Sequence, residues 1–398
     1  MQARELYTLY TILFLSLAGF GIVVPLLPQF VLELGAGPLH MALLISSYAL
    51  MQFLMAPVWG SVSDRIGRKP VLVAGLLGLG LSFLSIAMSQ SIWTAILART
   101  VGGILAAATM PTAQAYVGDA TTPAQRARAM GQMGAAIGLG FMVGPMLGGV
   151  LAVIGARTAL FITGGVDLLT AVLAALVLRE PAGARGRVER RPRGVRTLYQ
   201  VLTGPHAVLF WLAFVVTFSQ SQVFSMLGLY LAERFDDNGA LAGASFTVMG
   251  VISAGVQGLL VGALTDRFGE RRVIVAGLVL GTLGFTGFTA AGSISRVIAA
   301  VAVTACATSL IRPTIASAVS RRATHGQGIT MGIQSSFDSL GRVVGPLTAG
   351  VVYQALPGVP FLVALGCYVG SLLLARSRLL ALEHDGQAPA VQGGDGGS

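Results

Sequence analysis

Twelve long apolar segments, separated by short polar loops, constrain the fold of this chain more than any other feature. Each is close to the ~20 residues that an α-helix needs to cross the hydrocarbon core of a bilayer. The segments lie at 7–32, 40–61, 70–88, 92–117, 130–153, 157–178, 206–232, 241–264, 273–291, 296–319, 329–353 and 359–376. Because backbone groups in lipid must be hydrogen-bonded internally, the pattern predicts an all-α membrane protein with twelve transmembrane helices.

Charged residues are scarce in the chain. They make up 11% of it, against ~25% in an ordinary soluble domain. This excludes a soluble enzyme, and we expect no catalytic activity. The two cysteines, Cys306 and Cys367, lie in apolar segments without metal-ligand spacing. We therefore expect neither a metal site nor a cofactor.

The basic residues indicate how the chain is oriented in the membrane. Of 26 Lys and Arg residues, 20 lie in loops on one predicted side, and only Arg157, Arg234 and Arg296 lie in loops on the other. Basic residues concentrate in cytoplasmic loops. The pattern predicts that both termini are cytoplasmic, and it explains the net charge of +10 without a nucleic-acid partner.

An arginine-rich stretch divides the sequence into two halves. Residues 179–205 contain seven arginines with prolines and glycines, and they predict a basic cytoplasmic linker between six-helix bundles at 1–178 and 206–380. Residues 381–398 are polar and glycine-rich, and they predict a disordered tail.

The two halves also repeat each other at a nearly constant offset. Residues 64–67 match 266–269 and Pro111 matches Pro313 at 202, and Gly144-Pro145 matches Gly345-Pro346 at 201. Parallel repeats of this kind place a pseudo-two-fold axis along the membrane normal. They also place the substrate site near the midplane between the halves.

Three motifs resemble those of a known family. Residues 60–69 (GSVSDRIGRK) are similar to the signature loop of the major facilitator superfamily, and 262–272 form a degenerate copy. Arg99 with Gly103 resembles the arginine motif of that superfamily, and the glycines around Pro145 resemble the glycine-proline motif of its proton-coupled drug antiporters. The resemblance implies the 12-helix major facilitator fold, an inner-membrane location and drug:proton antiport by alternating access.

Residues 48–57, followed by the signature loop, are particularly similar to the tetracycline efflux group, with one departure. That group carries an acidic residue in the first helix, nine positions before the first proline. Counting back from Pro25, this position is Ser16, and no ionisable residue occurs from 8 to 32. The intramembrane acid of that group is missing here.

The motifs contain the residues that we expect to control gating. Gly67 permits the tight turn of a two-helix hairpin. Asp64 ends a helix, where the dipole disfavours negative charge, so a basic partner or another helix's N-terminus is expected. The resemblance implies that Asp64 belongs to a latch between the halves, and the alternative is that it caps its own loop. The glycines around Pro145 permit either plain helix packing or a sliding interface between the halves. The set is Gly60, Asp64, Arg65, Gly67, Arg68, Asp266, Arg267, Gly269, Gly144, Pro145, Gly148 and Gly149.

Five ionisable residues lie inside predicted spans, where an unpaired charge is costly: Arg99, Asp167, Arg312, Asp338 and Arg342. Arg312 and Asp338 lie at similar depths and Arg342 is one turn from Asp338, so we expect a cluster of these three. Asp338 belongs either to a charge network or to a proton pathway. Asp167 is either a protonation site or a structural contact, and the resemblance places Arg99 beside the central cavity.

Amide and aromatic side chains on the cavity-forming helices are candidates for substrate contact. Taken singly, each is better explained by packing or by a position that faces lipid, but together they favour an apolar, adaptable cavity that binds varied ligands. The candidates are Gln52, Gln114, Phe141, Gln220, Gln222, Phe224, Gln257, Gln334 and Phe337.

These patterns predict a monomeric exporter of lipophilic small molecules that is driven by inward proton movement. We expect the proton gradient rather than ATP as the energy source, because the glycines lie within spans and form no phosphate-binding loop. A transporter of another substrate class, such as a sugar, a metabolite or a lipid, is the first alternative. A non-transporting membrane receptor is the second.

Overall fold

The computed structural model describes residues 2–181, 207–237, 239–290, 292–321 and 327–378. The described residues are almost entirely helical, and no strand occurs among them. Most of the predicted basic linker at 179–205, and the whole tail predicted at 381–398, lie outside the described residues.

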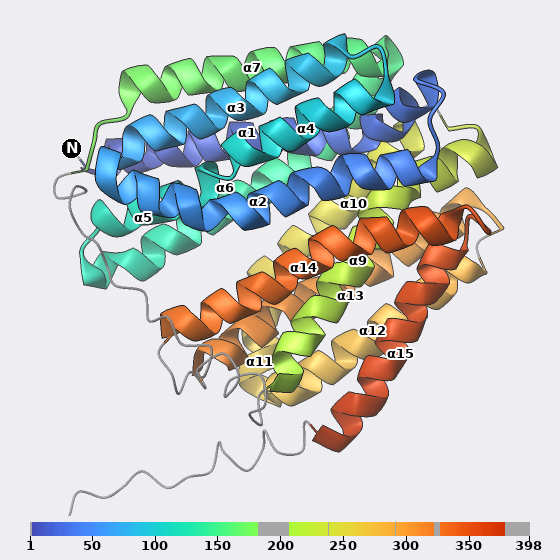
Figure 1. The fold of residues 1–398 in the computed structure, drawn as a ribbon. Helices are drawn as coiled ribbons and strands as arrows, with labels where there is room; N and C mark the ends of the chain where they lie inside the picture. Colours follow the sequence, from blue (N-terminus) through green and yellow to red (C-terminus); the bar gives the residue numbers. More distant parts are fainter. Residues whose placement is uncertain (1, 182–206, 238, 291, 322–326, 379–398) are drawn as a thin grey trace, which may run out of the picture.

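The first six predicted spans form an N-terminal bundle, coloured blue to green in Figure 1. The fourth span is divided in two by a turn at Ala107 and Ala108. The helices are α1 (Gln2–Glu33), α2 (Pro38–Ile66), α3 (Arg68–Met88), α4 (Ile92–Ala106), α5 (Thr109–Asp119), α6 (Pro123–Leu151), the short η1 (Ala152–Ile154) and α7 (Ala156–Val177).

The other six spans form the C-terminal bundle, coloured yellow-green to red. One span contains a π-helical turn, η2, which widens the helix between α10 and α11. The elements are α9 (Ala207–Phe235), α10 (Ala240–Gly255), η2 (Val256–Leu260), α11 (Val261–Phe268), α12 (Glu270–Thr289), α13 (Ile294–Arg321), α14 (Gln327–Tyr353) and α15 (Val359–Arg378).

The helices are longer than the apolar segments that predict them. For example, α6 begins at Pro123 rather than at 130, because proline is favoured at the first helical position and the helix continues through polar residues. Ten described helices are long and apolar enough to span a membrane, and a shorter apolar helix covers Val359–Leu374. With α14, which carries Asp338 and Arg342, they account for all twelve predicted spans. The predicted all-helical membrane fold is confirmed.

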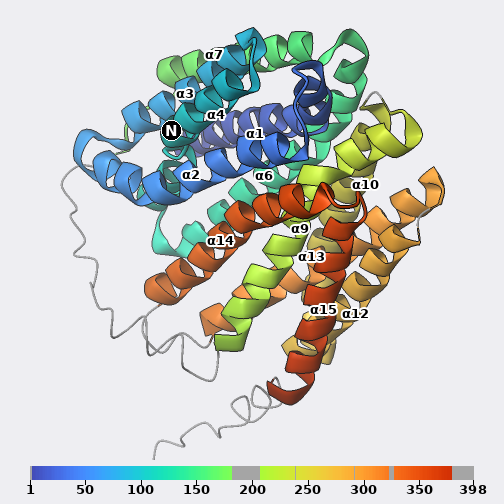
Figure 2. The ribbon, with the colours of Figure 1, turned by 45° about the vertical axis from the view of Figure 1, so that its right-hand side comes forward.

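The molecule has two ends that differ in how the halves meet. We call the end with the loops at Gly67, Gly269 and 120–122 the basic end, and the end with the loops at 34–37 and Gly239 the opposite end. The two bundles converge at the opposite end and splay apart toward the end where the chain begins (Figures 1 and 2). Across the halves, α2 packs on α14 and α6 packs on α10.

The hydrophobic cores show the same asymmetry. At the opposite end, one cluster of buried residues joins the halves, with Leu26 and Phe30 of α1 in the same cluster as Leu227 and Tyr230 of α9. Toward the basic end, the buried residues of the N-terminal bundle, such as Tyr116, form a cluster of their own. The halves are therefore packed together at the opposite end and separated at the basic end.

Candidate functional site

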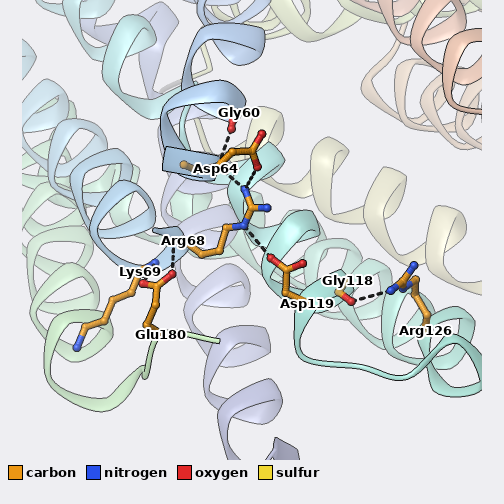
Figure 3. A network of polar contacts seen from close by, with 9 residues as sticks. Gly60, Asp64, Arg68, Lys69, Gly118, Asp119, Arg126 and Glu180 are labelled. Carbon is orange, nitrogen blue, oxygen red and sulfur yellow. Dashed lines mark hydrogen bonds and ion pairs between the residues drawn. The ribbon is translucent and has the colours of Figure 1, made fainter. Parts of the chain in front are cut away.

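The loop between α2 and α3 is organised around the guanidinium of Arg68 (Figure 3). Arg68 is only 7% exposed, and its Nε donates to Asp119 Oδ2 at 2.9 Å. Its Nη1 donates to Asp64 and to Ser63 Oγ. This side chain therefore joins the end of α2 and the start of α3 to the end of α5.

A second acidic residue, Glu180, caps the N-terminus of α3. Its carboxylate accepts hydrogen bonds from the backbone amides of Arg68 and Lys69, where the helix dipole favours negative charge. The carboxylate packs against Gly67, where a Cβ would lie 2.8 Å from it, and Gly67 has a left-handed φ of 111°. Glycine is therefore required at this turn both for conformation and for space.

In this conformation Asp64 has a local partner, and the latch expected between the halves is not formed. Its ion pair is with Arg68 on the same bundle, and among the described residues no ion pair or hydrogen bond joins Asp64 to the C-terminal bundle. This agrees with the separation of the halves at the basic end.

The second copy of the motif keeps the geometry and reverses the charges. Glu270 lies 202 residues after Arg68, and Arg321 lies 202 residues after Asp119. Arg321 Nε donates to Glu270 Oε1 at 3.0 Å. Each half thus joins the start of its third helix to the end of its fourth by an ion pair, with opposite polarity.

In the N-terminal bundle, Arg99 is enclosed by aromatic rings. It is 3% exposed, and its guanidinium carbon lies 4.1 Å from the centroid of Tyr48 and 5.3 Å from that of Phe20. Two of its nitrogens, Nε and Nη1, have no hydrogen-bond partner. Gln52 donates to the Tyr48 hydroxyl at 3.1 Å. Cation–π attraction is therefore the main compensation for burying this charge.

Asp167 of α7 is fully buried, and neither carboxylate oxygen has a hydrogen-bond partner. It packs against α1, where a Cβ at Gly19 would lie 3.0 Å from its Oδ1. Among the described residues, no ion pair within 4.0 Å joins it to Arg99. A buried carboxylate without a partner is costly as an ion, and protonation removes that cost.

A cavity of about 360 Å³ lies in the C-terminal bundle between α9, α10 with η2, α13 and α14. Five of the predicted residues line it: Gln220, Gln257, Gln334, Arg312 and Asp338. The π-helical turn carries Gln257. The lining is polar rather than mainly apolar as the sequence predicts, because hydroxyl side chains of α10 and α13 add to the amides. These hydroxyl residues, which the sequence analysis missed, are Ser253, Thr308 and Ser309.

The ion pair expected between Arg312 and Asp338 is not formed within 4.0 Å, although the structure describes both residues. Asp338 Oδ1 instead accepts a hydrogen bond from Thr217 Oγ1 at 2.7 Å. Arg342 is exposed and donates to Ser339 Oγ at 2.9 Å. Arg312 and Asp338 line the same cavity, as their similar depth along two helices predicts, but the hydrogen-bond partner of Asp338 is Thr217 of α9.

Several other candidates pack away from this cavity. Gln222 is fully buried without a hydrogen-bond partner for its amide. Phe224 stacks on Phe246, Phe337 packs against Trp211, and Phe141 packs against Phe20. Gln114 is exposed on α5. Hydropathy does not distinguish an aromatic core residue from one that faces a cavity.

The glycines of α6 fall into two groups. Gly140, Gly144 and Gly148 pack against α1 of the same bundle; a Cβ at Gly144 would lie 2.5 Å from the carbonyl oxygen of Ala18. Gly149 instead meets Gly243 of α10 across the halves, where a Cβ would lie 2.9 Å from the Gly243 Cα. The first group therefore packs within the bundle and the second belongs to the interface between the halves.

That interface opens along its length. At the opposite end Ser46 of α2 donates to the carbonyl oxygen of Val343, at 2.9 Å. Nearer the basic end, a Cβ at Gly134 of α6 or at Gly258 of η2 would meet nothing within 4 Å. The structure is therefore closed at the opposite end and open at the basic end.

Two six-helix bundles that meet at one end, with ionisable residues inside the spans, form the architecture of a membrane transporter. The chain belongs to the Major Facilitator Superfamily, whose family model matches residues 9–260 and 240–393. It is a multi-pass protein of the inner membrane.

Individual relatives agree with this assignment. Multidrug resistance protein 2 of Bacillus subtilis (strain 168) is 29% identical over 371 residues, which cover 91% of this chain and 92% of the relative. The class C tetracycline resistance protein of Escherichia coli is 30% identical, covering 86% of this chain and 87% of the relative. The fold alone is similar to that of the nucleoside transporter NupG (D323A mutant), whose solved structure has a TM-score of 0.79 at 14% identity, with 94% of this chain and 99% of that chain covered.

Proposed function

We propose that this chain is a monomeric, cofactor-independent antiporter that exports lipophilic small molecules in exchange for protons by alternating access. The observation that carries the proposal is the cavity between α9, α10, α13 and α14, which contains the ionisable residues Arg312 and Asp338. Two relatives that cover most of the chain are named for multidrug and tetracycline resistance, which supports this substrate class.

The side of the membrane to which this conformation opens follows from the charge distribution. Basic loops favour the cytoplasm, so the open basic end faces the cytoplasm in this conformation. A substrate then enters the cavity from the cytoplasm or from the inner leaflet. Closure of the basic end and opening of the opposite end release it outside.

Two carboxylates are candidates for carrying the proton. Asp167 is buried without a partner, so its charge state has a large energetic consequence. Asp338 is hydrogen-bonded to Thr217 and lines the cavity, so a substrate there can compete with a proton. At Asp167, protonation is coupled to the packing of α7 on α1. At Asp338, protonation is coupled to the presence of a substrate in the cavity.

A susceptibility panel in an efflux-deficient bacterial host tests the proposal. We expect the native protein to raise the inhibitory concentration of several lipophilic drugs. Asp167→Asn or Asp338→Asn, at equal expression, removes this protection, and loss with only one variant identifies the coupled carboxylate. Unchanged susceptibility to every drug, together with a sugar or lipid phenotype on gene deletion, would assign another substrate class.

A further inference from the structure

Arg312 has neither an ion-pair partner nor a hydrogen-bond partner within the part of the protein that the structure describes. It lies in the middle of α13, where Ile311 is fully buried, yet its own side chain is exposed and lines the cavity. No ion pair or hydrogen bond to its guanidinium occurs among the described residues. A guanidinium offers five donors in a planar fork that matches a carboxylate.

The charges around the cavity favour a negative ligand. Asp338 is the one carboxylate among the described residues that line it, and Thr217 already occupies one of its oxygens. Arg342, one turn further along α14, is exposed and adds a second cation beside the Asp338 charge. Two arginines against one aspartate leave a net positive charge, which attracts anions and repels cations.

The N-terminal bundle does not offset this charge. Asp167 is fully buried in α7 and Arg99 is enclosed between aromatic rings. Neither side chain lines the cavity. The cavity therefore differs from a wholly apolar drug pocket, because it offers one strong and oriented charge among neutral amides and hydroxyls.

We propose that the cavity selects lipophilic molecules that carry a carboxylate, with the carboxylate bound by Arg312. Gln257 and Gln334 are neutral hydrogen-bonding groups in the same lining, and Ala213 and Ile315 supply apolar surface for the rest of the ligand. The proposal rests on the proposed export function and specifies its substrate class. A permanent cation without an acidic group loses the guanidinium contact and meets like charge.

A pair of dyes that differ at one group tests this selection. Rhodamine B carries a free carboxylate, and its ethyl ester has the same cationic ring system with the carboxylate blocked. Fluorescence anisotropy with the purified full-length protein in detergent gives the two dissociation constants. We expect the native protein to bind the acid about 10-fold more tightly than the ester, as one partly screened charge-assisted hydrogen bond provides.

Three variants assign the preference to one side chain. Arg312→Gln removes the preference by weakening binding of the acid, and it does not weaken binding of the ester, because the like charge that the ester meets is lost as well. Arg312→Lys retains part of the preference. Arg296→Gln is the matched control, because Arg296 is exposed near the start of the same helix and distant from the cavity lining. Size-exclusion profiles and unfolding temperatures equal to those of the native protein establish that each variant is folded.

The outcomes separate this inference from the export function. Native protein that binds and exports the ester as well as the acid, or a preference that survives in Arg312→Gln, would overturn the inference and leave export standing. Native protein that binds neither dye and exports no compound in proteoliposomes would count against both.

Discussion

Glu270, at the start of α12, forms an ion pair with Arg321 at the end of α13. In the first half, Arg68 and Asp119 occupy the equivalent positions, at an offset of 202 residues, and pair with the opposite polarity. The contact between the third and fourth helices of each half has thus been kept while its charges were exchanged. What matters structurally is therefore the pairing of opposite charges rather than which helix carries which sign.

This relationship predicts that the N-terminal pair tolerates a double reversal. Arg68→Glu leaves Asp119 and Asp64 facing a third carboxylate. Breaking a buried ion pair lowers the free energy of unfolding by roughly 3–5 kcal/mol, so we expect the unfolding temperature to fall. Adding Asp119→Arg restores a large part of the loss. Thermal unfolding in detergent measures both changes.

Arg128→Glu is the control for this experiment, because Arg128 is exposed on α6 and has the same sign. It should change the unfolding temperature little. A double variant no more stable than Arg68→Glu alone would contradict the account of the repeat.

The turn at Gly67 gives a second prediction. Gly67→Ala destabilises the protein more than Gly35→Ala does. Both glycines have a positive φ, 111° and 67°, but an added Cβ meets the Glu180 carboxylate at Gly67 and nothing within 4 Å at Gly35. Unfolding temperatures of the two variants make the comparison, and equal losses would mean that Glu180 does not pack here.

The aromatic enclosure of Arg99 gives a third prediction. Tyr48→Phe keeps the ring beneath the guanidinium and loses only the hydrogen bond from Gln52. Tyr48→Leu removes the nearest ring and leaves the buried cation only the more distant rings of Phe20 and Phe83, which costs about 2 kcal/mol for the lost desolvated cation–π contact. Thermal unfolding should rank the native protein and Tyr48→Phe together above Tyr48→Leu. A ranking that places both variants equally low would assign stability to the hydroxyl group instead.

The open basic end gives a fourth prediction, tested in a background with Cys306→Ser and Cys367→Ser. Gly258→Cys fits without a clash and reacts readily with a maleimide added from the basic end. Ser46→Cys, at a position 3% exposed between α2 and α14, is the protected control. Equal labelling of both positions would contradict the closed opposite end.

Much of the fold could be predicted from the sequence, because a bilayer requires long apolar helices and allows charge only at particular places. The twelve spans follow from that requirement, and the glycines at Gly67 and Gly269 follow from the tight turns that join two of the helix pairs. The break at Ala107 and the π-helical turn at Val256–Leu260 could not be predicted, since both conserve hydropathy while changing the helical register.

The candidate site was less predictable because it depends on contacts between distant segments. Depth along two helices could place Arg312 and Asp338 at one level, but not show that Thr217 of α9 would bind Asp338. Asp119 and Glu180 follow or end apolar helices, and their positions beside Arg68 are set only by bundle packing. An acidic residue at the end of an apolar run does not by itself indicate which distant side chain it will contact.

The central claim is that proton movement drives export, and purified protein in proteoliposomes tests it most directly. The rate of dye transport is measured in proteoliposomes that contain the native protein, with and without an imposed pH gradient. The same measurement is made with Asp167→Asn and with Asp338→Asn, each incorporated at an equal amount. The account predicts that the gradient accelerates transport by the native protein and that at least one of the two variants loses this acceleration. Transport that proceeds at the same rate with and without the gradient would contradict it.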